Sequence, residues 1–577
     1  MRVQKRGGRA LLGALLLSTL VPCVSECTPP KAVVVDDFES GKLAGWRTAH
    51  GGSGDWFVYS DGKTPPDPSR TDPSVPFDVP NPPQGKFAAV TDMQGGGTRI
   101  LYRDLKLDGR FRLRLTVFYV NIAGELASPK TLDFNLLERN QQFRIDLMPP
   151  ASPVDSMADS DVLLNVFHTS PGDPARREPT AVEADLSALA GKTVRLRLAG
   201  ADNTGPFRIG VDEIRLEPLD ADARAELPAS STEPPGVVNG TLTVPRMKGE
   251  EALAALSTYA DQLVKNDQFS GTLLVARHGK VLFQKAWGRA NRETGAPVTL
   301  DTQFRIGSMN KMFTSVATLQ LVEAGKLALD EPIGKYLTDY PNKETASKVT
   351  IRHLLTHTGG TGDIFGPEFM ENRLTLRQHG DYVKLFGSRA PAYEPGTRFE
   401  YSNYGFILLG AILERVSGMS YFDSVRSRVF QPAGMASTDS LPESESVPNR
   451  AAGYTRGETG WVSNAETLPW SGTSAGGGYS TVGDLLRFAQ ALESGKLISK
   501  ATFAEAVTAR SEWYGYGFMI QDEGRLRSYG HNGGAPGING DLRIFPETGY
   551  VLVGLSNLDP PAASHLLDYF AARMPID

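Results

Sequence analysis

Cysteine is nearly absent from this chain of 577 residues, which contains only Cys23 and Cys27. Both lie close to the first residue, so residues 28–577 carry no thiol. A disulfide framework, a cysteine nucleophile and a zinc site with thiolate ligands are therefore excluded from that part of the chain.

An excess of positive charge and a long apolar run are also missing. The 60 basic residues are outnumbered by 66 acidic ones, which gives a formal net charge of −6. Because the basic residues form no tract, nothing would recruit a phosphate backbone, and we expect no nucleic-acid partner. The most apolar stretch, residues 11–21, is shorter than the roughly 18 residues expected of a membrane-spanning helix.

The first residues have the pattern of a secretory signal peptide. Several basic residues precede the apolar stretch 11–21, and small and polar residues follow it. We interpret residues 1–27 as a signal peptide and expect a periplasmic or secreted protein. A lipid anchor on Cys23 or Cys27 is an alternative, although Pro22 and Glu26 stand where a small residue is expected.

Residues 32–218 have the pattern of an antiparallel β-sandwich. Segments such as 112–117 and 193–198 alternate between apolar and polar residues and are separated by turns rich in Gly, Pro and Asp. The ends of this region, 35–41 and 207–214, resemble those of jelly-roll modules, many of which bind carbohydrate. The resemblance implies a jelly roll and a possible cell-wall or carbohydrate ligand.

Aromatic residues gather near the start of the predicted sandwich, at Trp46, Trp56, Phe57 and Tyr59. Flat aromatic faces stack on the apolar faces of sugar rings, so these residues could form a binding platform. The alternative, which we favour, is that they belong to the core or to turns.

A linker and a second domain follow. Residues 219–245 are rich in Pro, Ser and Gly and predict an extended linker. In residues 246–577, a helical pattern and two strands come first, helical stretches occupy the middle, and further strands are expected at 516–520, 541–545 and 550–555. This order predicts an α+β domain whose sheet is completed by both of its ends.

Ser308 and Lys311 form the first chemical motif of the second domain. They stand three residues apart at the expected start of a helix, so their side chains lie on neighbouring faces of its first turn. A serine hydroxyl needs a base within hydrogen-bonding reach, and a lysine in a desolvated pocket can serve as that base. Ser-x-x-Lys alone is common by chance, so the interpretation depends on further motifs.

Two further motifs follow in order, Tyr401-Ser402-Asn403 and His531-Asn532-Gly533-Gly534. With them, residues 250–570 resemble the serine β-lactamase and DD-peptidase superfamily, particularly its class C β-lactamase-like and esterase branch. The resemblance implies an antiparallel sheet with flanking helices and a helical subdomain. It also implies an enzyme that needs neither a metal nor another cofactor.

The resemblance assigns the catalytic roles. It implies that Ser308 forms an acyl-enzyme, that Lys311 and Tyr401 move its proton, and that Asn403 contacts the amide side of the substrate. The backbone N–H groups of Ser308 and Gly534 would form the oxyanion hole.

At the third motif, the resemblance places Gly533 and His531 beside the substrate. His531 would bind a substrate carboxylate or tune Tyr401. Dedicated β-lactamases commonly have lysine at this position, and a neutral imidazole binds a carboxylate less strongly than an ammonium group does. We therefore expect a small-molecule or peptide substrate, with D-amino-acid peptides or esters favoured over β-lactams. The alternative is a non-catalytic penicillin-binding protein.

Two other patterns suggest competing sites. The sequence Gly472-Thr473-Ser474-Ala475-Gly476 matches the Gly-x-Ser-x-Gly nucleophile elbow, but the preceding residues lack a buried strand pattern. His353 and His357 have the spacing of metal ligands on a helix, but no third ligand stands at a recognisable spacing. We expect a glycine-rich loop around Ser474 and structural roles for the two histidines.

Overall fold

The computed structural model describes residues 32–66, 77–92, 96–134, 139–244, 246–457, 460–523 and 526–576. They belong to two compact units, the first ending at Pro235 and the second beginning at Gly236. The predicted signal peptide and both cysteines lie outside the described residues. Within these residues, no single helix is long and apolar enough to cross a membrane; one pair of helices bent by 80°, Asn403–Ser417 with Tyr421–Ala433, meets the length and composition test only when taken together.

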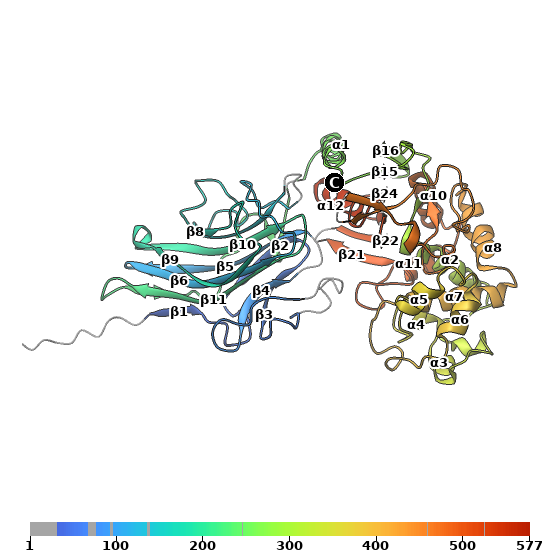
Figure 1. The fold of residues 1–577 in the computed structure, drawn as a ribbon, viewed down its shortest axis with the longest axis horizontal. Helices are drawn as coiled ribbons and strands as arrows, with labels where there is room; N and C mark the ends of the chain where they lie inside the picture. Colours follow the sequence, from blue (N-terminus) through green and yellow to red (C-terminus); the bar gives the residue numbers. More distant parts are fainter. Residues whose placement is uncertain are drawn as a thin grey trace, which may run out of the picture. The chain divides into compact units, whose positions relative to one another are not determined.

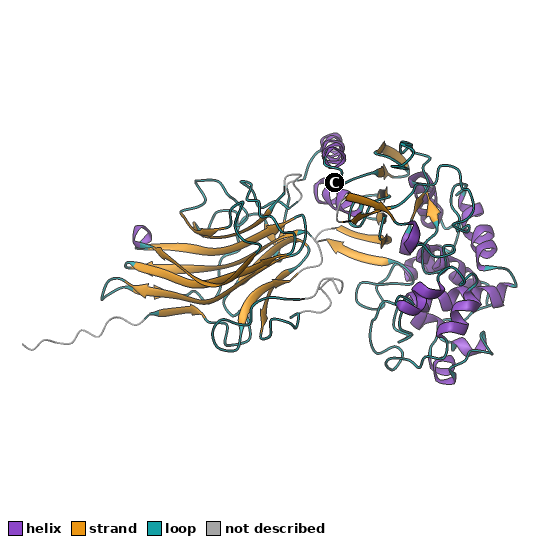
Figure 2. Cartoon of the chain, in the orientation of Figure 1, coloured by secondary structure: helices purple, strands orange, loops and turns teal. Residues whose placement is uncertain are grey.

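The first unit contains two antiparallel sheets (Figures 1 and 2). In one, the strand order is β3, β4, β11, β6, β9, with β1 also paired to β11; in the other, β2, β5, β10, β7 and β8 follow one another, and β12 also pairs with β5. The strands are β1 Val33–Asp36, β2 Arg47–Gly52, β3 Asp55–Tyr59, β4 Ala88–Asp92, β5 Gly97–Asp108, β6 Phe111–Asn121, β7 Gln141–Met148, β8 Leu164–His168, β9 Arg176–Asp185, β10 Lys192–Asp202, β11 Phe207–Pro218 and β12 Arg224–Glu226.

Alternating side chains build the core of this unit. In β6, Phe111, Leu113 and Leu115 are buried while Arg112 and Arg114 are exposed. The buried residues join one apolar cluster with residues of β5, β7, β10 and β11, so the two sheets share a core. The β-rich architecture is as predicted, and the jelly-roll topology stays a prediction.

The proposed aromatic platform is not present as such. Trp46, Trp56 and Tyr59 are only 8%, 3% and 3% exposed. The Trp46 indole N–H donates to Asp36, and the Tyr59 hydroxyl donates to the Pro80 carbonyl. These residues belong to the core, which was the favoured alternative.

Part of the predicted linker is attached to the first unit. Strand β12 lies within residues 219–245 and pairs with β5. Further along, the backbone N–H and the hydroxyl of Thr232 donate to Asp104, and Arg195 donates to the Thr232 carbonyl. The segment is fastened by hydrogen bonds to a buried ion pair and by Ala223 and Leu227, which pack on the core of the first unit.

The second unit is built on one antiparallel sheet in the order β16, β15, β24, β23, β22, β21. Strands from the beginning and the end of the unit are neighbours, as predicted, because β15 pairs with β24. Alternate residues of these strands face two separate apolar clusters, one shared with α1 and α12 and the other with α2 and α10. The strands are β15 Gly271–Arg277, β16 Lys280–Trp287, β21 Met519–Glu523, β22 Leu526–Ala535, β23 Ile538–Phe545 and β24 Tyr550–Ser556.

Most helices of the second unit lie between β16 and β21 in the sequence, and Figure 2 shows them gathered beside the sheet. They form the predicted helical subdomain, and α2 packs between it and the sheet, contacting α7 and β22. The helices are α1 Gly249–Lys265, α2 Asn310–Glu323, α3 Lys343–Lys348, α4 Ile351–Leu355, α5 Pro367–Asn372, α6 His379–Phe386, α7 Asn403–Ser417, α8 Tyr421–Val425, α9 Gln431–Ala433, α10 Val482–Glu493, α11 Lys500–Ala506 and α12 Ser564–Arg573.

Candidate active site

Ser308 lies in a tight turn between a short strand and a long helix. The strand β17 (Phe304–Arg305) is followed by a 3₁₀ turn at Gly307–Met309, and α2 begins only at Asn310. The predicted helix therefore starts two residues later than expected. Gly307 has φ of +53°, a conformation that favours glycine, so the turn requires glycine directly before Ser308.

Lys311 is fully buried beside this serine. Its ammonium nitrogen is 3.0 Å from the Ser308 hydroxyl oxygen, 2.8 Å from the Asn403 side-chain oxygen and 2.6 Å from the Ala475 carbonyl oxygen. Burial lowers the pKa of Lys311 to about 7, against the opposing charge of Asp363. A large fraction of Lys311 is therefore neutral near pH 7 and able to accept a proton from Ser308.

Tyr401 completes this group from the residue pair before α7. Its hydroxyl interacts with Ser308, and the Lys311 nitrogen lies 4.8 Å from the centre of its ring. Burial raises the pKa of Tyr401, although the interaction with Ser308 acts in the opposite direction. Near pH 7 the phenol therefore keeps its proton, and Lys311 is the better placed base in the free protein.

Asn403, at the first position of α7, connects Lys311 to a carboxylate that the sequence motifs did not include. Ser402 caps this helix by accepting the Gly405 N–H. The Asn403 amide nitrogen donates to Asp363 at 3.1 Å, while its oxygen accepts from Lys311. Asp363 is exposed and follows the Thr-His-Thr-Gly-Gly segment by three residues, so its negative charge lies at the surface, one hydrogen bond away from Asn403.

The two histidines with metal-like spacing have backbone partners instead. The His357 ring lies 4.2 Å from the Tyr401 ring, and its Nδ1 accepts the Ser402 N–H at 3.0 Å. The Nδ1 of His353 accepts the Thr350 N–H at the start of α4. These contacts fit the structural roles expected of both residues. His357 also supports Tyr401 directly, which the sequence did not reveal.

The predicted oxyanion donors lie in two segments, the Ser308 turn and β22, whose main chains pack directly against each other. Part of β22 packs on the Ser308 turn so closely that a Cβ atom at Gly533 would lie 1.9 Å from the Ile306 carbonyl oxygen. A Cβ at Gly307 would lie 3.0 Å from the Gly534 nitrogen. Strand β22 was not predicted, because its glycines lower strand propensity, yet only glycine permits this approach.

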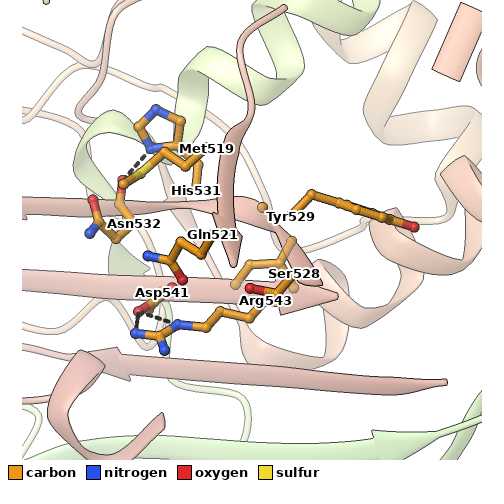
Figure 3. A pocket seen from close by; sticks show the side chains of 10 residues that line it. Met519, Gln521, Ser528, Tyr529, His531, Asn532, Asp541 and Arg543 are labelled. Carbon is orange, nitrogen blue, oxygen red and sulfur yellow. Dashed lines mark hydrogen bonds and ion pairs between the residues drawn. The ribbon is translucent and has the colours of Figure 1, made fainter. Parts of the chain in front are cut away.

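His531 occupies the same strand, and both of its ring nitrogens have protein partners, of which Figure 3 shows the one at Asn532. Nδ1 is bonded to the Asn532 carbonyl oxygen at 2.5 Å, and Nε2 to the Tyr514 hydroxyl at 2.9 Å. A carbonyl only accepts, so Nδ1 carries the proton and the Tyr514 hydroxyl donates to Nε2. Burial lowers the pKa of His531 to about 3, so the ring is neutral. Both expected roles of His531, binding a substrate carboxylate and influencing Tyr401, stay predictions.

Ser474 is placed as a loop residue. Its side chain is fully buried and its hydroxyl has no hydrogen-bond partner, while its backbone carbonyl accepts from Thr314. A substrate could not reach this hydroxyl in the observed conformation. The neighbouring Ala475 contributes to the site, but through its carbonyl oxygen on Lys311.

Comparison with known proteins identifies the second unit. The Beta-lactamase family model matches residues 256–573. The chain is 30% identical over 332 residues to penicillin-binding protein 4* of Bacillus subtilis (strain 168), covering 52% of this chain and 71% of that protein. It is 34% identical over 212 residues to esterase EstB of Burkholderia gladioli, covering 34% of this chain and 54% of that protein. The crystal structure of a penicillin binding protein from Bacillus halodurans matches with a TM-score of 0.50 and 33% identity, covering 54% of this chain and 98% of that one. The chain therefore belongs to the Beta-lactamase family and is a β-lactamase-like serine hydrolase.

Proposed function

We propose that this protein cleaves esters and D-amino-acid peptides or amides through an acyl-enzyme on Ser308, and that it acts poorly on β-lactams. The observation that carries the proposal is the 3.0 Å contact between Ser308 and a fully buried Lys311 whose pKa is lowered to about 7. A serine with such a partner is activated at neutral pH.

The proposed reaction uses the groups as they stand. Neutral Lys311 takes the Ser308 proton as the hydroxyl oxygen bonds to the substrate carbonyl carbon, and the carbonyl electron pair moves to its oxygen. The N–H groups of Ser308 and Gly534 would stabilise that oxyanion. When the tetrahedral intermediate collapses, the bond to the leaving amine or alcohol breaks and the leaving group takes a proton from Lys311, directly or through Tyr401. Water then gives a proton to Lys311 as its oxygen bonds to the acyl carbon; the bond between that carbon and the Ser308 oxygen breaks, the proton returns to Ser308 and the carboxylic acid leaves.

The substrate preference is argued from the charges around these groups. Position 531 supplies a neutral imidazole whose two nitrogens are occupied, rather than a cation. Asp363 adds a negative charge next to Asn403. Both features disfavour a substrate carboxylate close to the reacting bond, whereas a neutral ester or amide meets no such penalty. Among the relatives, one is a D-aminopeptidase of Brucella anthropi, 27% identical over 283 residues and matched over 52% of its length.

The proposal is tested with a fluorophosphonate probe, a fluorescent penicillin and three substrates: a neutral ester, a D-alanyl peptide amidated at its C-terminus and a cephalosporin. We expect the fluorophosphonate to label Ser308, and kcat/KM to be highest for the ester or the D-peptide. A wild-type protein that no probe labels would refute the acyl-enzyme. Penicillin labelling without turnover of any substrate would instead support a recognition protein, and efficient cephalosporin hydrolysis would overturn the proposed preference.

A further inference from the structure

The loop that carries Ser474 forms the wall on which Lys311 rests. We call residues 473–476 the lysine-wall loop. The Ala475 carbonyl accepts from Lys311 at 2.6 Å, Asn310 donates to the Thr473 carbonyl at 2.9 Å, and Thr314 donates to the Ser474 carbonyl at 2.7 Å. Three successive carbonyls of this loop are therefore held by side chains of the helix that also carries Lys311.

A fourth contact comes from a different helix. His379, the first residue of α6, is buried, and its Nε2 accepts the Ser474 backbone N–H at 3.3 Å. Its Nδ1 is 3.1 Å from a carboxylate oxygen of Glu414 on α7. Because an N–H group can only donate, Nε2 is unprotonated, and Nδ1 must carry the proton that is donated to Glu414. The hydrogen bonds thus run in one direction, from the loop to His379 and from His379 to Glu414.

The His379 ring is packed tightly against the lysine-wall loop and has little room to move. A Cβ atom at Gly410 of α7 would lie 2.4 Å from the Ser474 hydroxyl oxygen and 2.5 Å from His379 Nε2. The His379 ring also lies 4.8 Å from the Tyr421 ring, whose hydroxyl is 2.8 Å from the Thr314 hydroxyl oxygen. The imidazole is therefore held both by packing and by Glu414.

We infer that His379 is a positioning residue for Lys311: oriented by Glu414, it fixes the lysine-wall loop so that the Ala475 carbonyl meets the lysine nitrogen. The inference rests on the proposed function in that Lys311 is taken as the base for Ser308. It also explains the buried Gly-x-Ser-x-Gly match, since here the backbone N–H of Ser474 is used and its hydroxyl is not.

The inference predicts a particular change at Lys311. The Ala475 carbonyl accepts from the lysine and so favours its charged form. If the loop moves, the ammonium loses this acceptor, the pKa of Lys311 falls below its present value, and the nitrogen is less well placed against Ser308. We expect kcat/KM to fall by about tenfold to a hundredfold, the scale of a misplacement of about 1 Å in a catalytic group.

The test compares two substitutions in the full-length protein. His379→Leu fills the space without an acceptor, whereas His379→Gln keeps an acceptor near the position of Nε2. We expect His379→Leu to lower kcat per titrated active site with little change in KM for a neutral ester, and His379→Gln to recover much of the loss. As a matched control, His565→Leu removes a histidine that contacts Tyr259, outside the site, and should change neither constant.

A second readout does not depend on turnover. The protonation of Lys311 is followed by NMR of ¹³C-labelled lysine, with the signal assigned by its loss in Lys311→Met. We expect its midpoint to move to lower pH in His379→Leu and to remain near the wild-type value in His379→Gln and His565→Leu. An unmoved midpoint in His379→Leu would overturn the inference even if the protein is less active. Should Ser308 resist labelling while the midpoint moves, the proposed hydrolysis fails and the positioning role stands.

Discussion

The two units bury cations to the same extent but surround them differently. In the β-sandwich, Arg195 and Arg197 are fully buried, and each donates to a carboxylate, Asp104 and Asp146 respectively. In the hydrolase unit, Lys311 is equally buried, but its three hydrogen-bond partners are a hydroxyl, an amide oxygen and a carbonyl oxygen.

This difference distinguishes buried cations that only stabilise the fold from a buried cation that can exchange a proton during a reaction. A carboxylate partner compensates the loss of water around a buried cation, and arginine keeps its proton in any case. Neutral acceptors compensate less, so the same burial shifts the lysine toward its uncharged form. Lys311 can therefore exchange its proton because no carboxylate of the described residues contacts it directly. Asp363 is separated from it by another side chain.

The largest effect is expected when the hydroxyl that Lys311 would deprotonate is removed. Ser308→Ala should abolish covalent labelling and turnover, because Lys311 would have no hydroxyl to activate. Ser474→Ala should keep most of the activity, since its hydroxyl has no partner. Mass spectrometry of the labelled protein checks both variants. A Ser308→Ala protein that is still labelled would remove Ser308 from the mechanism.

The second effect breaks the charge pair on the structural side. Burial alone would raise the pKa of Asp146, but the hydrogen bond from Arg144 and the charge of Arg197 bring it below its ordinary value. Asp146→Ala leaves Arg197 buried without its carboxylate, and we expect a loss of about 3–5 kcal/mol in the unfolding free energy of the sandwich. Denaturant unfolding measures this loss. Ester turnover per folded molecule should stay unchanged, and a fall there would show that the two kinds of buried charge are not independent.

The third effect removes the chemical charge. Lys311→Ala should lower the acylation rate by at least about a hundredfold, the scale of losing a positioned proton acceptor. In the wild type, kcat/KM should rise with pH through about 7, because the neutral form of Lys311 is the active one and its pKa is lowered to that value. Stopped-flow labelling across this pH range measures both. A near-normal rate in Lys311→Ala would exclude the lysine as base.

The fourth effect converts one kind of site into the other. Asn403→Asp would give Lys311 a carboxylate partner like those in the sandwich and favour its charged form. We expect the rise of kcat/KM with pH to move upward by about one to three pH units. The pH profile is the measurement, because the amplitude also reflects any lost substrate contact of Asn403. A profile that stays in place would show that the neutral partners do not set the protonation of Lys311.

The smallest effect concerns the separation of the two units. A chain beginning at Gly236 keeps Arg246 and Met247, which donate to carbonyls at the end of α12. We expect it to fold and to hydrolyse small esters with most of the full-length kcat/KM. Circular dichroism and ester kinetics check this. An insoluble or inactive product would show that the sandwich contributes to the hydrolase unit.

The sequence located the reactive group well but not its surroundings. Ser308, Lys311 and Tyr401 stand in ordered motifs, and the structure brings them together. Asp363 and the Ala475 carbonyl carry no motif, because their roles depend on where the chain folds back. The same applies to residues 219–235, where Thr232 is hydrogen-bonded to the buried ion pair of Asp104 and Arg195. It also applies to β22, whose glycines lower the strand propensity of its sequence.

Gly533 also bears on how this site could be inhibited or altered. With the Ile306 carbonyl 1.9 Å from any added Cβ, the spacing of the two proposed oxyanion donors is fixed by main chain alone. A library that randomises position 533 should yield no functional member other than glycine. An inhibitor that relies only on those two N–H groups would accordingly leave little room for resistance by a single substitution there, whereas one that relies on exposed Asp363 could be evaded by changing one side chain.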